Sequence, residues 1–237
     1  EIRAVRFPLG MPVVQRIQPF KISISLSDPV RNGPKLYGLE RIIKVYPPLD
    51  VSSGRKFTPV LVYDPEGRTE GVLKKLGIRQ KPVSTIPEEG APYTLVIGEG
   101  ALRRLDAENL TVLQQRLQSG QQTTIILAQQ NYPQGFPFGL TLNRRHGTSR
   151  GFIAAPGHPL FGDLSEADVQ LWARDLSISK RDFNLPTGGG YRALVVGGGT
   201  GGLVYTPLIE KPGTAGTTLF CQFSIGEKIA REPAAAS

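Results

Sequence analysis

Two carboxylates follow predicted strands at the positions where enzymes with a parallel sheet place their catalytic side chains. Asp64 directly follows the apolar run Phe57–Tyr63, and Glu99 comes two residues after the run Tyr93–Ile97. Such runs are typical of strands buried on both faces of a sheet, and ligands bind beyond the carboxyl ends of those strands. A carboxylate pair about 5–10 Å apart is what glycoside hydrolysis requires. The pair therefore indicates a cleft, and an independent hydrolase is one interpretation of it.

His158, which precedes a proline, is a third catalytic candidate because histidine exchanges protons near neutral pH. No acidic residue stands beside it in the sequence to suggest a dyad, so a structural hydrogen bond is the alternative interpretation. Charged, solvated loop positions are the corresponding alternative for Asp64 and Glu99. The same strand ends are also consistent with a small-molecule-binding module that has no catalytic activity.

Covalent catalysis lacks an evident nucleophile in this sequence. A nucleophile elbow places Ser or Cys in the turn after a strand, whereas the run Thr123–Ala128 is followed by Gln129-Gln-Asn131. Cys221 lies inside an apolar run and is predicted to be structural. Gly197–Gly202 matches the letters of a dinucleotide-binding loop, but a strand-like segment follows it, so we predict a hairpin turn. One Cys and two His residues predict no metal site, and we predict no cofactor.

The elements that would position these residues alternate between strands and helices. A short helix is predicted with Thr69 as its N-cap, and a longer one runs from an N-cap at Asp106 to Gly120. Strand, helix, strand, helix, strand predicts an α/β fold with a parallel sheet. Residues 129–163 are expected to be loop, and a capping box at Ser165–Asp168 opens a short helix that contains Trp172. Further strands are predicted at 192–196, at 203–205 with a break at Pro207, and at 217–225.

The N-terminal segment has a different pattern. Apolar and polar residues alternate at 2–7 and 20–26, a further strand is expected at 40–46, and no helix is predicted. A few antiparallel strands cannot close a sandwich alone. We therefore predict a partial β-sandwich over residues 1–54 and an α/β domain over 55–237. Because the chain begins with Glu1, it is expected to be a processed chain or a piece of a longer protein.

The charge of the chain is basic but dilute. Its 237 residues include 28 Lys and Arg against 20 Asp and Glu, a net charge of +8, and the basic residues form no run. A nucleic-acid surface usually gathers basic residues with aromatic ones between them, so no nucleic-acid partner is predicted. No stretch approaches the 18 apolar residues of a spanning helix, so no membrane association is predicted either.

Five segments, 60–67, 95–102, 158–164 with Trp172, 207–210 and 219–223, carry a family resemblance. They resemble the class I glutamine amidotransferase-like accessory domains of bacterial glycoside hydrolases related to family 2 and to β-galactosidases. The resemblance implies a flavodoxin-like, doubly wound, mainly parallel sheet with a glycine turn at Val96–Gly100. It places Gln129–Asn131 at the nucleophile position, so glutaminase chemistry does not carry over. The strand Ile42–Pro48 resembles the closing strand of a preceding β-sandwich.

The resemblance implies a non-catalytic accessory segment of a carbohydrate-active enzyme, for domain packing, assembly or weak glycan binding. Its implied partners are other domains of a larger chain or further copies in a homo-oligomer, with carbohydrate as a candidate ligand. The location implied by the family is periplasmic or secreted.

Overall fold

The structure, a computed structural model, contains two compact units, Glu1–Asp50 and Val51–Ser237. It describes residues 10–26, 37–47, 58–88, 90, 92–136, 139–162, 164–172, 175–199, 201–230 and 235. The expected strand at 2–7 and the expected domain boundary at residues 54 and 55 lie outside the described residues.

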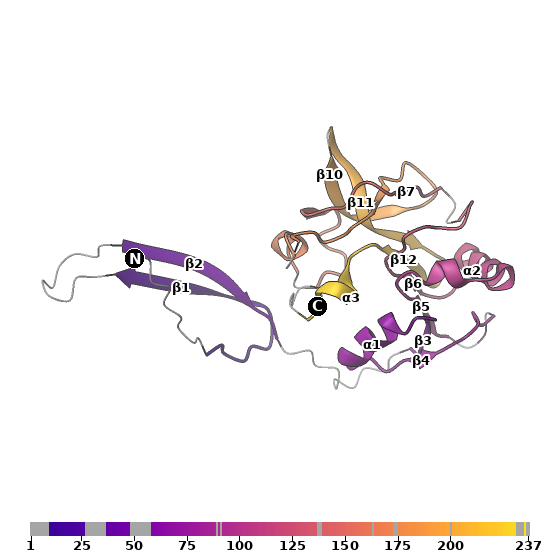
Figure 1. Cartoon of the computed structure of the whole chain (residues 1–237), viewed down its shortest axis with the longest axis horizontal. Helices are drawn as coiled ribbons and strands as arrows, with labels where there is room; N and C mark the ends of the chain where they lie inside the picture. Colours follow the sequence, from indigo (N-terminus) through magenta and orange to yellow (C-terminus); the bar gives the residue numbers. More distant parts are fainter. Residues whose placement is uncertain are drawn as a thin grey trace, which may run out of the picture. The chain divides into compact units, whose positions relative to one another are not determined.

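The first unit contains an antiparallel hairpin of β1 (Gln18–Leu26) and β2 (Tyr37–Val45) (Figure 1). Phe20 pairs with Ile43 and Ile24 with Leu39, so these four apolar residues share one face, whereas Ile42 lies on the other. The prediction of antiparallel strands here is confirmed. No third strand joins them in the described part of this unit, and a lone hairpin is marginally stable in water. On this face Phe20, Leu39 and Ile43 are half-buried, while Ile24 is exposed.

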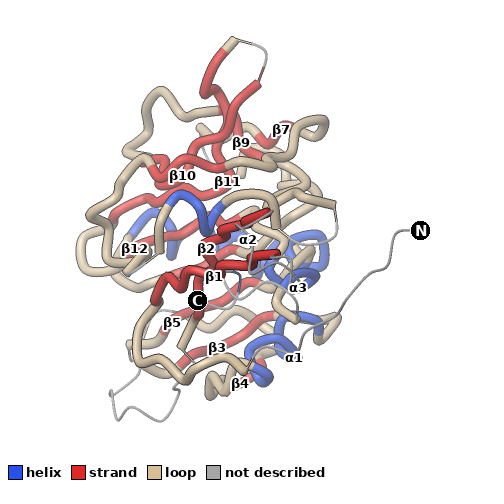
Figure 2. Tube along the Cα trace, turned by 90° about the vertical axis from the view of Figure 1, so that its left-hand side faces the viewer, coloured by secondary structure: helices blue, strands red, loops and turns tan. Residues whose placement is uncertain are grey.

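The second unit is built on one large sheet, of which five neighbouring strands are parallel. Their order is β4-β3-β5-β6-β12, and each pairs in parallel with the next. Figure 2 shows this sheet running from β4 at one end of the unit towards β10. The three parallel strands predicted from the apolar runs are confirmed as β3, β5 and β6, whereas β4 was not predicted and β12 was predicted only as a strand, without its parallel pairing. Their bounds are Val60–Tyr63 for β3, Lys81–Pro82 for β4, Thr94–Ile97 for β5, Thr124–Ile126 for β6 and Thr217–Cys221 for β12.

Beyond β12 the sheet becomes antiparallel, so it is a mixed sheet rather than a parallel one throughout. The order continues β11-β10-β8, and β9 pairs with both β11 and β7. Three of these short strands were not predicted, and two of them fall in the segment expected to be loop. The bounds are Leu142–Asn143 for β7, Gly151–Ile153 for β8, Asp182–Asn184 for β9, Arg192–Gly199 for β10 and Gly202–Pro212 for β11.

The glycine-rich segment is the tip of the β10–β11 hairpin, where Gly199 pairs with Gly202. The predicted hairpin turn is confirmed. The predicted strand break at Pro207 is wrong, because β11 continues through it. The register of β10 against β11 shifts between the Tyr205 and Leu208 pairs, and such an irregularity accommodates a residue that has no N–H to donate.

Helices cover both faces of the parallel strands. α2 (Ala107–Ser119) lies on one face, and α1 (Arg68–Lys75) and α3 (Ile225–Lys228) lie on the other (Figure 1). Asp106 caps α2 by accepting from the N–H of Asn109 at 2.8 Å, as predicted. Gly120 ends α2 at a φ of 59°, where glycine is favoured.

The predicted N-cap of α1 was wrong, because Gly67 precedes the helix and Thr69 lies within its first turn. The Thr69 hydroxyl accepts from the N–H of Glu99 instead. The capping box at Ser165 and Asp168 is confirmed, but it opens only the 3₁₀ turn η2 (Glu166–Val169), which ends before Trp172. A second 3₁₀ turn, η1 (Ala101–Arg104), follows β5.

Two apolar clusters hold the second unit together. In the first, Leu113 and Leu117 of α2 pack with Ile97 of β5 and Phe220 of β12. In the second, Trp172 packs edge-on against Phe223 with ring centroids 5.4 Å apart, beside strands β10 to β12. The elements are therefore fixed in an α/β unit with a mixed sheet, accompanied by the small antiparallel hairpin of the first unit.

Candidate functional site

A pocket lies at the carboxyl edge of the parallel strands, where ligands of α/β sheets bind. The loops after four of these strands, β3, β5, β6 and β12, contribute to it, together with the residues just before β9. Its volume is about 200 Å³. The residues that line it are Glu66, Arg68, Glu99, Gly100, Arg103, Ala128, Gln129, Gln130, Lys180, Arg181, Gln222, Ser224 and Glu227.

Glu99, predicted from the sequence, is in this pocket. Its carboxylate accepts from the N–H of Gly226 at 3.0 Å, which joins the end of β5 to the first turn of α3. Burial raises the pKa of Glu99, the Gly226 N–H opposes that change, and the negative charges of Glu227 and Asp64 add to it. No cation lies within 4.0 Å of this carboxylate among the described residues. Glu99 is therefore a partly buried carboxyl group with a structural hydrogen bond.

Asp64 lies beside Glu99 but is not among the residues that line the pocket. Its Oδ2 accepts from the N–H of Glu70 at 2.9 Å and so holds the start of α1, and its Oδ1 is buried without a hydrogen-bond partner in the described part of the chain. A Cβ on Gly98 would lie 2.8 Å from Asp64 Oδ1. The absence of a side chain at Gly98 is what lets Asp64 occupy this place.

Gln129 and Gln222 form the floor of the pocket. Both are almost fully buried, and the N–H of Gln129 donates to Gln222 Oε1 at 2.9 Å. Gln129 Nε2 donates to the carbonyls of Gly98 and Leu127, while its Oε1 accepts from the N–H of Leu102. All the hydrogen-bonding groups of this side chain are engaged, so Gln129 ties the loops after β5, β6 and β12 together.

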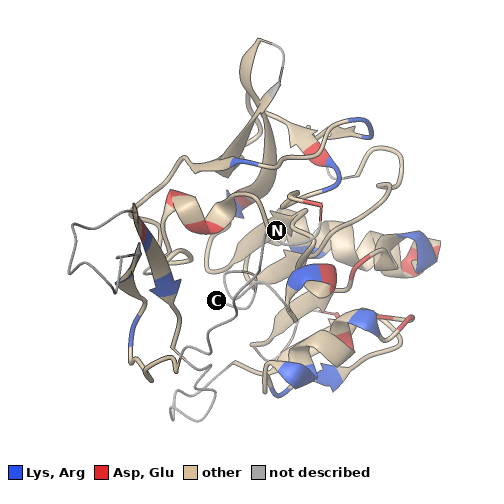
Figure 3. Ribbon diagram, turned by 60° about the vertical axis from the view of Figure 1, so that its left-hand side comes forward, with Lys and Arg blue, Asp and Glu red and all other residues tan. Residues whose placement is uncertain are grey.

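The rim carries charges of both signs. Glu66 accepts from Arg103 and lies 3.0 Å from Arg68, and the Arg103 contact lowers the pKa of Glu66. Lys180 pairs with Glu227. Arg181 donates to the carbonyl of Gln130. Charges of both signs are spread over the whole second unit rather than gathered on one face (Figure 3).

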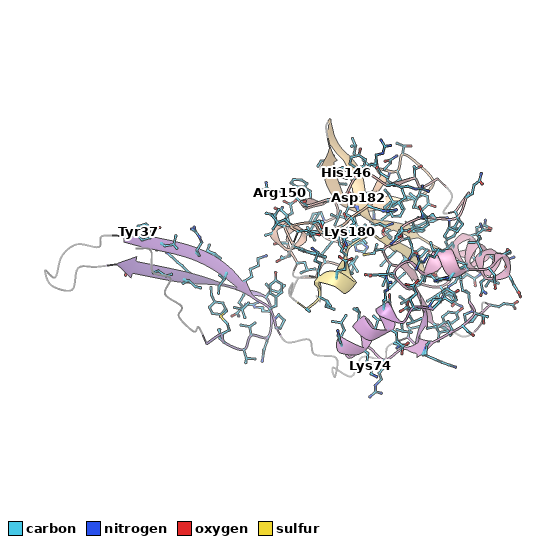
Figure 4. All side chains as sticks on the ribbon, viewed as in Figure 1. Tyr37, Lys74, His146, Arg150, Lys180 and Asp182 are labelled. Carbon is cyan, nitrogen blue, oxygen red and sulfur yellow. The ribbon has the colours of Figure 1, made fainter. Side chains whose placement is uncertain are left out.

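His158 is not in the pocket. It lies in the loop after β8, where its Nε2 is 3.2 Å from Glu210 Oε1 on β11, and Arg192 pairs with the same carboxylate. The structure therefore brings Asp64 and Glu99 together but places His158 elsewhere, in a structural contact. His146 is also apart from the pocket: its Nδ1 is 2.8 Å from Asp182 Oδ2 (Figure 4).

Cys221 is buried in β12, and burial raises its pKa to about 12. The thiol is therefore protonated at neutral pH and is poorly suited to nucleophilic attack. Ser224 is the one hydroxyl-bearing residue among those described as lining the pocket, and no histidine lines it. No group of three or more His, Cys, Asp or Glu side chains in the described ranges is arranged to hold a metal ion.

Sequence reasoning missed Gln222, Lys180 and Arg181. A signal for Gln222 was present, since it directly follows the apolar run that forms β12, as Asp64 follows β3. The strand predicted at 217–225 contains Gln222, and the parallel pairing of β12 with β6, which makes this position a strand end of the sheet, joins segments far apart in the chain. No local pattern marks Lys180 and Arg181, which reach the pocket only through the placement of β9.

The chain matches no family model, no curated protein and no solved structure. No helix in the parts of the chain that are described is both long and apolar enough to cross a membrane. Fold and pocket geometry, with the sequence resemblance, are therefore the basis for proposing a function.

Proposed function

We propose that this chain is a non-catalytic accessory segment of a carbohydrate-active enzyme, of the glycoside hydrolase class, whose second unit serves in recognition or domain assembly. One observation carries the non-catalytic part of the proposal. At the ends of β3, β5 and β6, where catalytic groups would stand, the side chains of Asp64, Glu99 and Gln129 accept hydrogen bonds from backbone N–H groups. Groups committed to holding the backbone are poorly placed to exchange protons with a substrate.

The side chains that line the pocket also support a non-catalytic role. A triad needs a nucleophile within hydrogen-bond reach of a base, and the pocket offers Ser224 without a histidine among its described lining residues. Two carboxylates acting on a glycosidic bond must both face the substrate, whereas Asp64 is outside the lining. These features favour binding over turnover.

The fold and the sequence resemblance support the second part of the proposal, that the chain is a segment working beside other domains of a larger enzyme. With the parallel strands counted in chain order, β4-β3-β5-β6-β12 corresponds to 2-1-3-4-5, the order of flavodoxin-like sheets. The hairpin of the first unit gathers apolar residues on one face and leaves Ile24 exposed there, as a strand pair from a larger β-sandwich would. Both features favour a segment that works beside other domains.

The proposal is tested by measuring hydrolysis of a panel of nitrophenyl glycosides by the purified chain. We expect no turnover above the rate of a heat-denatured sample. The matched variant is Glu99→Gln, which keeps the oxygen that accepts from Gly226. Turnover at ordinary enzyme rates that Glu99→Gln abolishes would overturn the proposal and establish the alternative, a hydrolase with its cleft at Asp64 and Glu99.

A further inference from the structure

One side-chain donor at the floor of the pocket, Gln222 Nε2, is buried. Gln222 is 2% exposed, and its Nε2 has no hydrogen-bond partner among the described residues. Its Oε1 accepts from the N–H of Gln129, which fixes which end of the amide carries the nitrogen. A buried donor left unpaired carries an energetic cost, so native structures seldom keep one without a reason. An acceptor that enters the pocket would remove that cost.

A cationic side chain, Arg181, lines the same pocket as this donor. The loop after β6 is held from two sides: Gln222 accepts from Gln129, and Arg181 donates to the carbonyl of the next residue, Gln130. Both side chains line the pocket. The described residues provide no carboxylate within 4.0 Å of the Arg181 guanidinium, in contrast to Lys180, which pairs with Glu227. An acceptor at Gln222 would therefore share the pocket with a guanidinium that has no ion pair among the described residues.

The volume of the pocket and the residues that line it restrict the size and the polarity of a ligand that could bind there. Its volume of about 200 Å³ is below the roughly 300–1,000 Å³ of pockets that hold drug-sized ligands. No aromatic side chain is found among the described lining residues, so a ring-stacking platform is absent there. The walls are polar and charged, which favours a small hydrophilic ligand.

We propose that the pocket binds a small hydrophilic ligand through a carboxylate or phosphate group, which accepts from Gln222 Nε2 and is neutralised by Arg181. Charge-assisted hydrogen bonds of this kind are stronger than those between neutral groups. The inference goes beyond the accessory role proposed above and does not depend on it. It assigns ligand binding to the end of β12, rather than to the two carboxylates Asp64 and Glu99.

The test is isothermal titration of the full chain with D-glucuronate, glucose 6-phosphate and glucose. The first two carry the two candidate anions, and glucose is the neutral match. We expect glucuronate, glucose 6-phosphate or both to bind with a Kd in the millimolar range or tighter, and glucose not to bind. The response to each anion identifies which of the two groups the site prefers.

Two variants localise the binding. Gln222→Glu keeps the oxygen that accepts from Gln129 and replaces the donor by an anionic oxygen, and Arg181→Gln removes the charge. Each should weaken anion binding about tenfold or more, because a hydrogen bond to a charged group is lost. Lys74→Gln is the control of matched charge, since Lys74 lies on α1 and points away from the second unit (Figure 4). Circular dichroism verifies folding, and Arg181→Gln stands as the test if Gln222→Glu does not fold.

Three results would overturn the proposal. The first is that neither anion binds the unmodified chain, and the second is that glucose binds as tightly as the anions. The third is that Arg181→Gln binds the anion as tightly as Lys74→Gln does. Each of them leaves the accessory role standing, because turnover of glycosides is measured separately.

Discussion

Gln129→Met tests whether one buried amide holds the carboxyl edge of the sheet together. The substitution keeps a similar shape and removes the hydrogen bonds that the side chain makes. The carbonyl of Gly98 keeps a partner, since it also accepts from the N–H of Ala101. The N–H of Leu102 and the carbonyl of Leu127 lose their side-chain partner. Two unsatisfied groups at about 1–3 kcal/mol each predict a loss of about 2–6 kcal/mol in the free energy of unfolding.

The assay is urea unfolding followed by the fluorescence of Trp172, the single tryptophan, which is buried in the second unit. With a slope of about 2 kcal/mol/M, the midpoint should fall by about 1–3 M. Gln130→Met is the matched control, because this neighbouring side chain is exposed. Equal midpoints for Gln129→Met and Gln130→Met would refute the assignment of a structural role to the Gln129 amide.

Three further outcomes follow from the same region. Gly98→Ala should destabilise the chain by about 1–3 kcal/mol, because the new Cβ would meet Asp64; an unchanged urea midpoint would contradict this. Burial raises the folded-state pKa of Glu99, so its folded form holds its proton to higher pH than the unfolded chain, and stability should decline as pH rises from about 4.3 through that pKa. Glu99→Gln should remove this decline in melting temperature between pH 4 and pH 8, and an identical pH profile would count against it. Cys221 should not react with a thiol reagent until the chain unfolds, and rapid labelling of the native chain would show that the thiol is not buried as described.

The sequence predicted the elements whose signals are local. The helix from Asp106 to Gly120 has a capping side chain, an apolar face and a terminal glycine, and each is used as expected. The parallel strands follow from apolar runs too short for helices. The hairpin at Gly199 and Gly202 was predicted because no helix could follow it.

The features that could not be predicted from the sequence are those that depend on pairing between distant segments of the chain. β7, β8 and β9 contain only two or three residues each, too few to establish an alternating pattern. Of the candidate residues, Asp64 and Glu99 follow the neighbouring parallel strands β3 and β5, but only Glu99 lines the pocket. His158 stands apart from them because its loop leads into the antiparallel part of the sheet, and no local pattern marks that change of direction.

The contact between Gln129 and Gln222 joins residues 93 positions apart in the chain. In the chain, β12 follows the whole antiparallel region. Bringing β12 beside β6 therefore closes a long segment, and the entropic cost of that closure comes before any strand pairing compensates it. During synthesis, β3, β5 and β6 leave the ribosome long before their last neighbour, with one edge of β6 still uncovered. The pocket is thus among the last features to form, and a chain that ends before β12 leaves the edge of β6 exposed and prone to aggregation.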